Sequence, residues 1–406
     1  MTTKMRPFGE TISLDEARKR IDAAVRPIDR TERVALAEAS GRVLAEDVVA
    51  NADVPPFARA AMDGYAVRAQ DTAGASKEHA QVLKRVETLY TGQVTQRTVG
   101  AGECIEIATG APMPPGADAV VIVEDTDGEA SGAVRVFAAV QPGQHIGRQG
   151  ADIRSGQRVL HSGTTLTPSR VGAIAALGLD HAAVYARPRI AILSTGNEIV
   201  DPGGPLAPGQ IYDVNRFTLA AVAAEHGAEP VTYRTANDTL EDLSRALDAA
   251  LQEDVLVFSG GSSVGERDLI LDVLGARGEV IFHGIAVKPG KPTAFGRVSG
   301  KLFFGMPGYP ASCLTNAFIL LAPVLRRMAR LAPRPPRTVT LPLSARVASA
   351  PGRHQFYTVR VVNGEAVPAF KSSGDITSMS QADGYIEIPA SESAVDRGTI
   401  VEVKLF

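Results

Sequence analysis

The chain contains 406 residues, which is too many for one ordinary hydrophobic core. At about 150 residues per domain, we expect two to four domains. Hydrophobic residues make up 45% of the chain and charged residues 21%, which is typical of a globular protein. The formal net charge of −3 provides no general basic field, so we expect no nucleic acid partner.

The N-terminal 20 residues contain no apolar stretch of the kind found in signal peptides. The longest apolar run, residues 317–325, is too short to span a bilayer, so we expect a cytoplasmic protein without a membrane partner. The two cysteines, Cys104 and Cys313, lie far apart in the sequence. This spacing excludes a disulfide scaffold and a cysteine-rich metal site, so we expect two buried thiols.

The first predicted element is an amphipathic helix. Ser13 and Glu16 have the spacing of a capping box, and Pro27 ends the helical pattern. The apolar positions that follow one helical face are Leu14, Ala17, Ile21 and Ala24.

From residue 51 to 147 the pattern changes to short β-type runs separated by glycine and proline. The clearest predicted strands in this β-rich insertion are residues 82–86, 104–107, 119–124 and 133–137.

Residues 188–331 alternate between strands, glycine-containing loops and helices, which predicts a parallel sheet covered by helices on both faces. Ligands of such sheets bind at the carboxyl ends of the strands. After the proline-rich linker 332–336, alternating β patterns predict a small barrel in residues 337–406.

The strongest chemical signal is the pair Lys288 and Lys291, which lies on a backbone stiffened by Pro289 and Pro292. Two fixed positive charges at a strand end suit phosphate or another small oxyanion. The alternative is a solvated turn with ordinary surface lysines.

Residues 259–265 form a second loop, in which Gly260, Gly261, Ser262 and Ser263 precede a predicted helix. Backbone N–H groups of such a loop can converge on an anion. Asp268, just inside the helix, could cap it or bind a divalent cation.

Two further loops follow predicted strands. In residues 305–312, Ser312 could cap a helix or donate to an oxyanion. In residues 194–198, Glu198 is a candidate for metal binding or proton transfer. In the β-rich insertion, Asp63 precedes a glycine and could simply form a turn, and Thr109, Arg148 and Asp152 lie in similar loops.

Taken together, these motifs resemble one family. The segments AMDGYAV (61–67), TGAPMPPGADAVV (109–121), STGNE (194–198), IYDVNR (211–216), SGGSSVG (259–265), KPGKPTAFG (288–296) and GMPGYPAS (305–312) occur in the order typical of molybdopterin molybdenumtransferase, the MoeA family. The E domain of gephyrin is similar. The resemblance runs from about residue 10 to the C-terminus.

The resemblance implies a multidomain α/β plus all-β fold with an elongated subunit. The expected domains are a discontinuous domain (10–50 with 148–187), a β-rich insertion domain (51–147), a central three-layer α/β domain with a parallel sheet (188–331) and a C-terminal β-barrel domain (337–406). It further implies a homodimer that inserts molybdenum from molybdate into adenylylated molybdopterin, releasing AMP in molybdenum cofactor biosynthesis. Mg2+ or a similar divalent cation assists. The pterin adenylyltransferase and recipient molybdoenzymes are implied partners.

The family pattern implies three groups of site residues. The catalytic group is Asp63, Glu198, Asp268, Lys288 and Lys291. The substrate-binding group is Thr109, Arg148, Asp152, Gly260, Gly261, Ser262, Ser263, Pro292, Ser312 and Ser373. The metal group is Asp268, Glu198 and Asp238.

The sequence departs from the usual family residues at several positions near this set: Gly147, Ala151, Asn197, Asn237, Gly284 and Tyr309. Two other hypotheses therefore remain. One is a pterin-binding or scaffolding paralogue with weakened catalysis, and the other is a nucleotide-pyrophosphate hydrolase.

Overall fold

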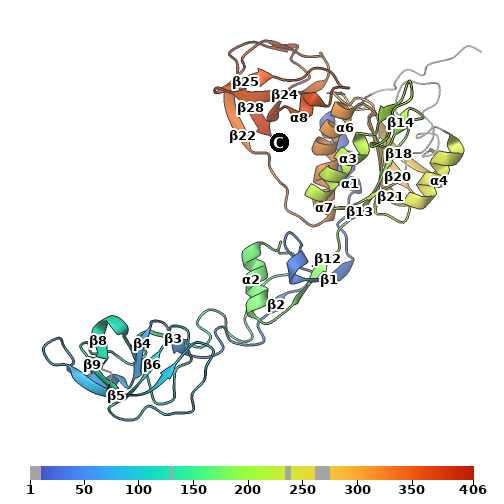
Figure 1. Ribbon diagram of the computed structural model, residues 1–406. Helices are drawn as coiled ribbons and strands as arrows, with labels where there is room; N and C mark the ends of the chain where they lie inside the picture. Colours follow the sequence, from blue (N-terminus) through green and yellow to red (C-terminus); the bar gives the residue numbers. More distant parts are fainter. Residues whose placement is uncertain (1–10, 129–130, 234–238, 261–274) are drawn as a thin grey trace, which may run out of the picture. The chain divides into compact units, whose positions relative to one another are not determined.

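The computed structural model describes residues 11–128, 131–233, 239–260 and 275–406, and the chain divides into two compact units (Figure 1). The first unit contains Met1–Glu32, Gly41–Val43 and Val184–Phe406. The second contains Arg33–Ser40 and Leu44–Ala183. Each unit has hydrophobic cores of its own, so each is a separately packed body.

The first unit contains a six-stranded sheet in the order β16-β13-β17-β21-β20-β18. Its strands are β13 (Arg189–Ser194), β16 (Glu229–Thr232), β17 (Val255–Ser259), β18 (Gly278–His283), β20 (Ala294–Val298) and β21 (Lys301–Met306). Strands β16, β13, β17 and β21 pair in parallel, whereas β20 pairs antiparallel with both β21 and β18, so β20 runs against the other five strands. The sheet is therefore mixed, and the prediction of a parallel sheet is wrong for one of its six strands.

The antiparallel part follows from a tight turn between β20 and β21. Val298 pairs with Lys301, so only Ser299 and Gly300 form the turn, with φ of 48° and 80°. Positive φ at both central residues is typical of the turns that join antiparallel strands. A parallel connection would instead need a crossover of a dozen or more residues.

Alternate residues of the central strands enter two different cores. Ile190 and Ile192 face one core, and Ala191 and Leu193 face the other. The first core also takes residues from α1 (Leu14–Ala24), α3 (Asn215–Glu225), α6 (Pro310–Asn316), the π-helix Ala317–Leu321 and α7 (Ala322–Met328), and the second takes residues from α4 (Leu240–Ala250). Helices thus lie on both faces of the sheet (Figure 1).

Helix α1 confirms the predicted helix and its buried face. Ser13 Oγ accepts a hydrogen bond from Glu16 N at 3.2 Å, and all four predicted apolar positions are buried. The Glu16 carboxylate accepts a bond from Arg20 Nε at 2.7 Å. The carboxylate is therefore used within the helix, in an i,i+4 ion pair.

The C-terminal strands form a second six-stranded sheet in the order β19-β24-β26-β28-β22, with β25 paired to β24. Its members are β19 (Val287–Lys288), β22 (Thr338–Pro342), β24 (His354–Val362), β25 (Glu365–Pro368), β26 (Gly384–Ile388) and β28 (Ile400–Leu405). Nearby are β23 (Val347–Ala348), α8 (Thr377–Ser380) and β27 (Ala394–Val395). Since β19 belongs to the α/β part of the sequence, it joins the two parts of this unit.

The second unit contains a six-stranded sheet in the order β7-β4-β6-β5-β9-β8. Its strands are β4 (Gly64–Val67), β5 (Gln81–Leu89), β6 (Glu103–Ile107), β7 (Ala119–Ile122), β8 (Thr126–Gly128) and β9 (Ala133–Val136). The four strands predicted here correspond to β5, β6, β7 and β9.

The remaining short strands in the described ranges are β1 (Thr31–Ala35), β2 (Val48–Val49), β3 (Arg59–Ala60), β10 (Ile146–Gly147), β11 (Arg158–Leu160), β12 (His181–Tyr185), β14 (Ile199–Val200) and β15 (Ile211–Tyr212). The other helices in the described ranges are α2 (Pro168–Ala176) and the 3-10 turns Leu36–Glu38, Ala69–Thr72 and Val123–Asp125.

Both cysteines are buried free thiols, as predicted. Burial raises the pKa of Cys104 and of Cys313 to about 12, so neither thiol is activated as a nucleophile.

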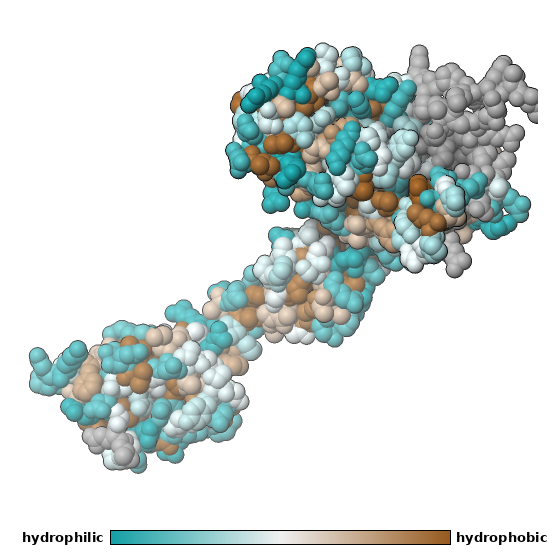
Figure 2. All heavy atoms as spheres, turned by 45° about the horizontal axis from the view of Figure 1, so that its top comes forward, coloured by the Kyte–Doolittle hydropathy of each residue, from teal (hydrophilic) through white to brown (hydrophobic). Residues whose placement is uncertain are grey.

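Within the described ranges, no helix is both long and apolar enough to cross a bilayer. Hydrophilic and hydrophobic residues are mixed over the face drawn in Figure 2.

The packing of α1 gives a first testable prediction. Ile21 is 3% exposed, so Ile21→Ala should destabilise the first unit by about 2–5 kcal/mol through lost contacts and a cavity. Urea unfolding followed by circular dichroism measures the change. Lys19→Ala alters an exposed position of the same helix and should leave the midpoint unchanged. Equal midpoints for the two variants would contradict this account of the core.

Candidate active site

A cavity of about 520 Å³ lies at the carboxyl ends of the central parallel strands, within the first unit. Ser194 ends β13, Ser259 ends β17 and Pro307 follows β21, and all three line the cavity. This edge of the sheet is where α/β folds bind ligands.

One side of the cavity is basic. Lys288 and Lys291 line it, as predicted, and Arg353 adds a third cation that the sequence analysis missed. Arg353 immediately precedes β24, which pairs in parallel with β19 through Val287 and His354. This strand pairing brings Arg353 and the two lysines to the same cavity. A cavity with converging cations is suited to an anionic ligand.

Two carboxylates among the described residues also line the cavity. Asp213 is buried, accepts a hydrogen bond from Arg216 N at 3.0 Å and lies 3.5 Å from Arg216 Nε. Its charge is therefore compensated within the protein. Glu198 is exposed, and none of the described side chains forms an ion pair or hydrogen bond with its carboxylate. Glu198 is therefore the cavity carboxylate that remains open to a ligand.

The loop that carries the two lysines is held by a buried amide. Asn316 is fully buried, and its Nδ2 donates to Gly290 O at 2.9 Å and to Thr293 Oγ1 at 2.5 Å. Thr293 Oγ1 in turn donates to Gly290 O at 2.9 Å. These bonds restrain the backbone from which both lysine side chains extend.

Gly290 is required at this position for two reasons. Its φ is 105°, in a region that residues with a side chain rarely adopt. A Cβ atom here would lie 2.3 Å from Asn316 Nδ2, so any larger residue would push the amide away.

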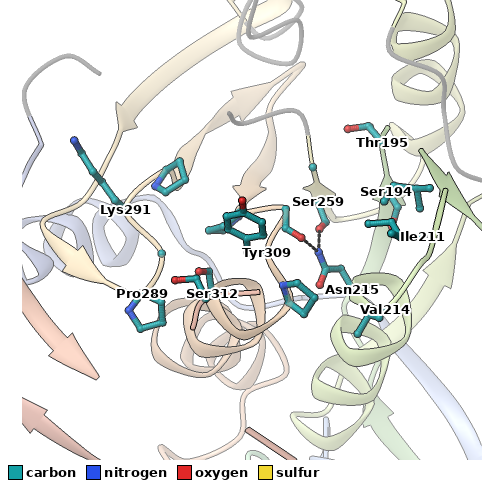
Figure 3. Close-up of a pocket in the computed structure, with 18 of the residues that line it drawn as sticks. Ser194, Thr195, Ile211, Val214, Asn215, Ser259, Pro289, Lys291, Tyr309 and Ser312 are labelled. Atoms are coloured by element: carbon teal, nitrogen blue, oxygen red, sulfur yellow. Dashed lines mark hydrogen bonds between the residues drawn. The ribbon is translucent and has the colours of Figure 1, made fainter. Parts of the chain in front are cut away.

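Another part of the cavity, the neutral side, is lined by four uncharged polar residues: Ser194, Thr195, Asn215 and Ser259 (Figure 3). Asn215 Nδ2 donates to Ser259 Oγ at 2.7 Å and to Gly308 O at 2.8 Å. Asn215 Oδ1, Ser194 Oγ and Thr195 Oγ1 are buried and have no hydrogen-bond partner in the described part of the chain. Unpaired buried polar atoms are costly, and a bound polar ligand can satisfy them.

In the second unit, Asp63 and Thr109 form a local pair. Asp63 Oδ1 accepts bonds from Thr109 N at 2.6 Å and from Thr109 Oγ1 at 2.9 Å. The backbone bond, followed by the hydroxyl bond, lowers the pKa of the Asp63 carboxyl. Since both residues are exposed, this unit presents an ionised carboxylate at its surface.

Family comparisons agree along the whole chain. Residues 12–178 match the MoeA N-terminal region (domain I and II), residues 191–327 a "Probable molybdopterin binding domain", and residues 340–406 the MoeA C-terminal region (domain IV). The chain is 38% identical over 395 residues to molybdopterin molybdenumtransferase 2 of Mycobacterium tuberculosis, covering 94% of this chain and 95% of that protein.

The chain belongs to the MoeA family. The molybdopterin molybdenumtransferase of Haemophilus influenzae is 36% identical over 318 residues, with 78% of each chain covered. Among solved structures, the molybdopterin biosynthesis MoeA protein of Pyrococcus horikosii matches with a TM-score of 0.83 and 38% identity, covering 98% of this chain and 99% of that one.

The structure brings part of the predicted family site together. The cavity is lined by seven of the predicted residues: Glu198, Gly260, Lys288, Lys291, Pro292, Ser312 and Ser373. Asp63, Thr109, Arg148 and Asp152 belong to the second unit. Asp238, Gly261, Ser262, Ser263 and Asp268 lie outside the described residues. Within the described ranges, no group of three or more metal-binding side chains is found.

The lining residues that the sequence analysis did not assign to the site include Arg353, Asn215 and Ser259. Asn215 lies in the segment IYDVNR that carries the family resemblance, and Ser259 precedes the glycine loop. Their signals were therefore present in the motifs. Arg353 has no comparable local signal, because its place depends on the pairing of β19 with β24.

The buried amide of the lysine loop gives a second prediction. Asn316→Ala should weaken anion binding although both lysines remain. Gly290 O and Thr293 Oγ1 both lose the Nδ2 donor, and a buried polar atom left unpaired costs about 1–3 kcal/mol. Thermal unfolding with and without molybdate measures the loss of ligand protection.

The matched control is Thr315→Val. Its hydroxyl is also buried but donates to Ala311 O within helix α6, away from the lysine loop. This variant should lower the melting temperature while molybdate still raises it by the normal amount. The same protection in Asn316→Ala as in the unaltered protein would refute the role of the amide.

Proposed function

We propose that this chain transfers molybdenum from molybdate to adenylylated molybdopterin and releases AMP, as a step of molybdenum cofactor biosynthesis. The names of its relatives support the first half of this statement, because they are molybdopterin molybdenumtransferases. The observation that carries the proposal for this chain is the convergence of Lys288, Lys291 and Arg353 on one cavity. Both molybdate and the phosphates of the adenylylated pterin are oxyanions that such cations bind.

The two sides of the cavity support different tasks. The basic side suits the phosphates and molybdate, with Ser312 as a hydroxyl donor beside them. The neutral side offers Asn215, Ser194 and Thr195 to the polar edge of an organic group. A volume of about 520 Å³ lies within the range of small-molecule sites, about 300–1,000 Å³.

We propose that a divalent cation such as Mg2+ assists at the acidic part of the site. The exposed carboxylate of Glu198 at the cavity fits a hard cation, whose preferred ligands are oxygens. Asp268 and Asp238 are its proposed partners. The cation would neutralise phosphate charge while the lysines orient the phosphates.

We also propose the finer architecture that the family resemblance implies. The domains would comprise 10–50 with 148–187, 51–147, 188–331 and 337–406. The two cores on opposite faces of the central sheet support a three-layer arrangement. The isolated bridge between Leu343 and Ala366 supports closure of the C-terminal sheet into a barrel, because it links the end of β22 to β25.

The proposed working form is a cytoplasmic homodimer that receives its pterin from the adenylyltransferase and delivers the product to molybdoenzymes. The two free thiols support a reducing compartment. In this proposal, Asp63 and Thr109 of one subunit complete the cavity of the other. Arg148 and Asp152 are proposed to bind substrate beside them.

The activity test is incubation with adenylylated molybdopterin and Mg2+, following AMP release with and without molybdate. Release that requires molybdate is the expected result. Equal release in both conditions would favour a nucleotide-pyrophosphate hydrolase. Binding of the pterin without release would favour a scaffolding paralogue.

A third prediction concerns the lysine loop. Lys291→Ala should lower molybdate or phosphate affinity about 10- to 100-fold, because a hydrogen bond to a charged group contributes about 1.5–3 kcal/mol. Isothermal titration with molybdate measures the change. Lys19→Ala removes an exposed lysine far from this loop in the sequence and should bind normally. An unaltered molybdate affinity in Lys291→Ala would exclude this lysine from the site.

A fourth prediction tests the shared site. Asp63 belongs to the second unit and Lys291 to the first, so Asp63→Asn and Lys291→Ala can be combined by co-refolding. Each variant alone should be nearly inactive. In a mixed dimer with composite sites, one site carries both changes and the other carries neither.

Random reassortment makes about half of the dimers mixed, so about a quarter of all sites should be intact. Recovery of AMP release to that level is the expected result. If native mass spectrometry detects mixed dimers but activity stays at the level of the parents, the two residues act within one subunit.

A further inference from the structure

Tyr309 is an exposed aromatic side chain inside the cavity. It precedes helix α6 as its N-cap, but its side chain makes no capping bond. Its exposed fraction is 67%, whereas Phe295 and Phe303 of the same unit are buried in the cores. The local fold therefore gives no packing reason for an aromatic ring at this position.

The contacts of its neighbours place Tyr309 between the two sides of the cavity. Gly308 O accepts the bond from Asn215 Nδ2, so the residue before Tyr309 touches the neutral side. On the other side, a Cβ atom at Gly374 would lie 3.7 Å from Tyr309 Cδ1. In Figure 3 the ring lies between Lys291 and Ser312 on one side and Ser259 and Asn215 on the other.

The ring is supported by the loop around Gly374 but leaves much of its surface open. Other apolar lining residues add to this open surface: Ile211, with an exposed fraction of 54%, and Tyr212, with 38%. Further apolar lining residues include Pro292, Pro307 and Pro310. An aromatic face that is supported but largely open suits a flat ring, which it attracts by dispersion and by its quadrupole.

We propose that Tyr309 is a positioning residue that stacks on a planar nitrogen heterocycle of the substrate and directs the attached phosphate to the basic side. The proposal rests on the proposed function, because the adenylylated pterin carries two such rings, the purine and the pterin. The shared chemistry is a fused, flat heterocycle joined to phosphate. Stacking would also determine which end of the substrate meets the buried amide and hydroxyl groups of Asn215, Ser194 and Thr195.

A hydrogen bond from the tyrosine hydroxyl is the competing explanation, and Tyr309→Phe separates the two. Phenylalanine keeps the aromatic face and removes the hydroxyl, so stacking predicts normal binding. Tyr309→Ala removes the face. Since the side chain is largely exposed, neither change should alter the melting temperature appreciably.

The experiment measures binding of three probes by isothermal titration: AMP, a pterin monophosphate and the ringless ribose 5-phosphate. The unaltered protein and Tyr309→Phe should bind at least one ring-bearing probe about 5- to 150-fold more tightly than ribose 5-phosphate. Tyr309→Ala should abolish this preference and leave ribose 5-phosphate binding unchanged. The probe that loses affinity identifies which ring stacks.

The chain contains no tryptophan, so Tyr309→Trp introduces a single fluorescent reporter at the cavity. The stacking probe should quench its emission, and ribose 5-phosphate should not. Ile400→Ala removes a side chain of similar exposure, 63%, outside the cavity lining and should bind all probes normally.

Loss of affinity in Tyr309→Phe as large as in Tyr309→Ala would overturn the proposal in favour of the hydroxyl. No preference for a ring-bearing probe in the unaltered protein would also overturn it. These results do not depend on molybdate. Failure of the proposed function would instead appear as molybdate-independent AMP release from a protein whose ring preference is intact.

Discussion

The site depends on the loop that brings two positively charged residues, Lys288 and Lys291, to one cavity. Like charges repel, and long lysine side chains lose conformational entropy when they are fixed. The protein restricts the backbone instead. Asn316, a fully buried amide, binds Gly290 and Thr293, so the segment between Lys288 and Lys291 has one conformation. Preorganisation of this kind reduces the free energy that binding must spend on ordering the site.

The neutral side of the cavity is organised differently. Asn215 uses its two N–H donors on Ser259 and Gly308, which leaves its Oδ1 unpaired among the described residues. Ser194 Oγ and Thr195 Oγ1 are likewise unpaired among the described residues. Each buried polar atom without a hydrogen-bond partner lowers the stability of the folded protein. The large cores on both faces of the sheet can offset such a local cost. A difference in polarity across one cavity also gives an asymmetric substrate only one favourable orientation.

Much of this arrangement could be predicted from the sequence because its signals are local. The helical spacing of apolar residues predicted helix α1 and its buried face. The strand-loop-helix repeats predicted that the glycine and lysine loops share one edge of a sheet. The reversed strand β20 was missed. The two-residue turn Ser299-Gly300 was the available signal, but the short strand before it contains a glycine and was not identified.

Arg353 could not be predicted in the same way. It reaches the cavity through the pairing of β19 with β24, which joins segments distant in the sequence, and no local pattern encodes such a partner. Asn215 lies within one of the motifs that carry the family resemblance. Its bond to Ser259 depends on the position of helix α3, which it begins, relative to β17. Site residues within a local motif could therefore be predicted from the sequence. The cation that reaches the cavity from another sheet could be identified only from the fold.

The pairing of β19 with β24 also ties the C-terminal sheet to the chemistry of the α/β sheet. Val287 lies opposite His354, so a shift of one residue in β24 would replace Arg353 by its imidazole neighbour at the cavity edge. The cavity edge would then carry an imidazole in place of a guanidinium. The terminal sheet thus supplies one charge of the cavity from outside the lysine loop, so the charge can be changed without changing that loop.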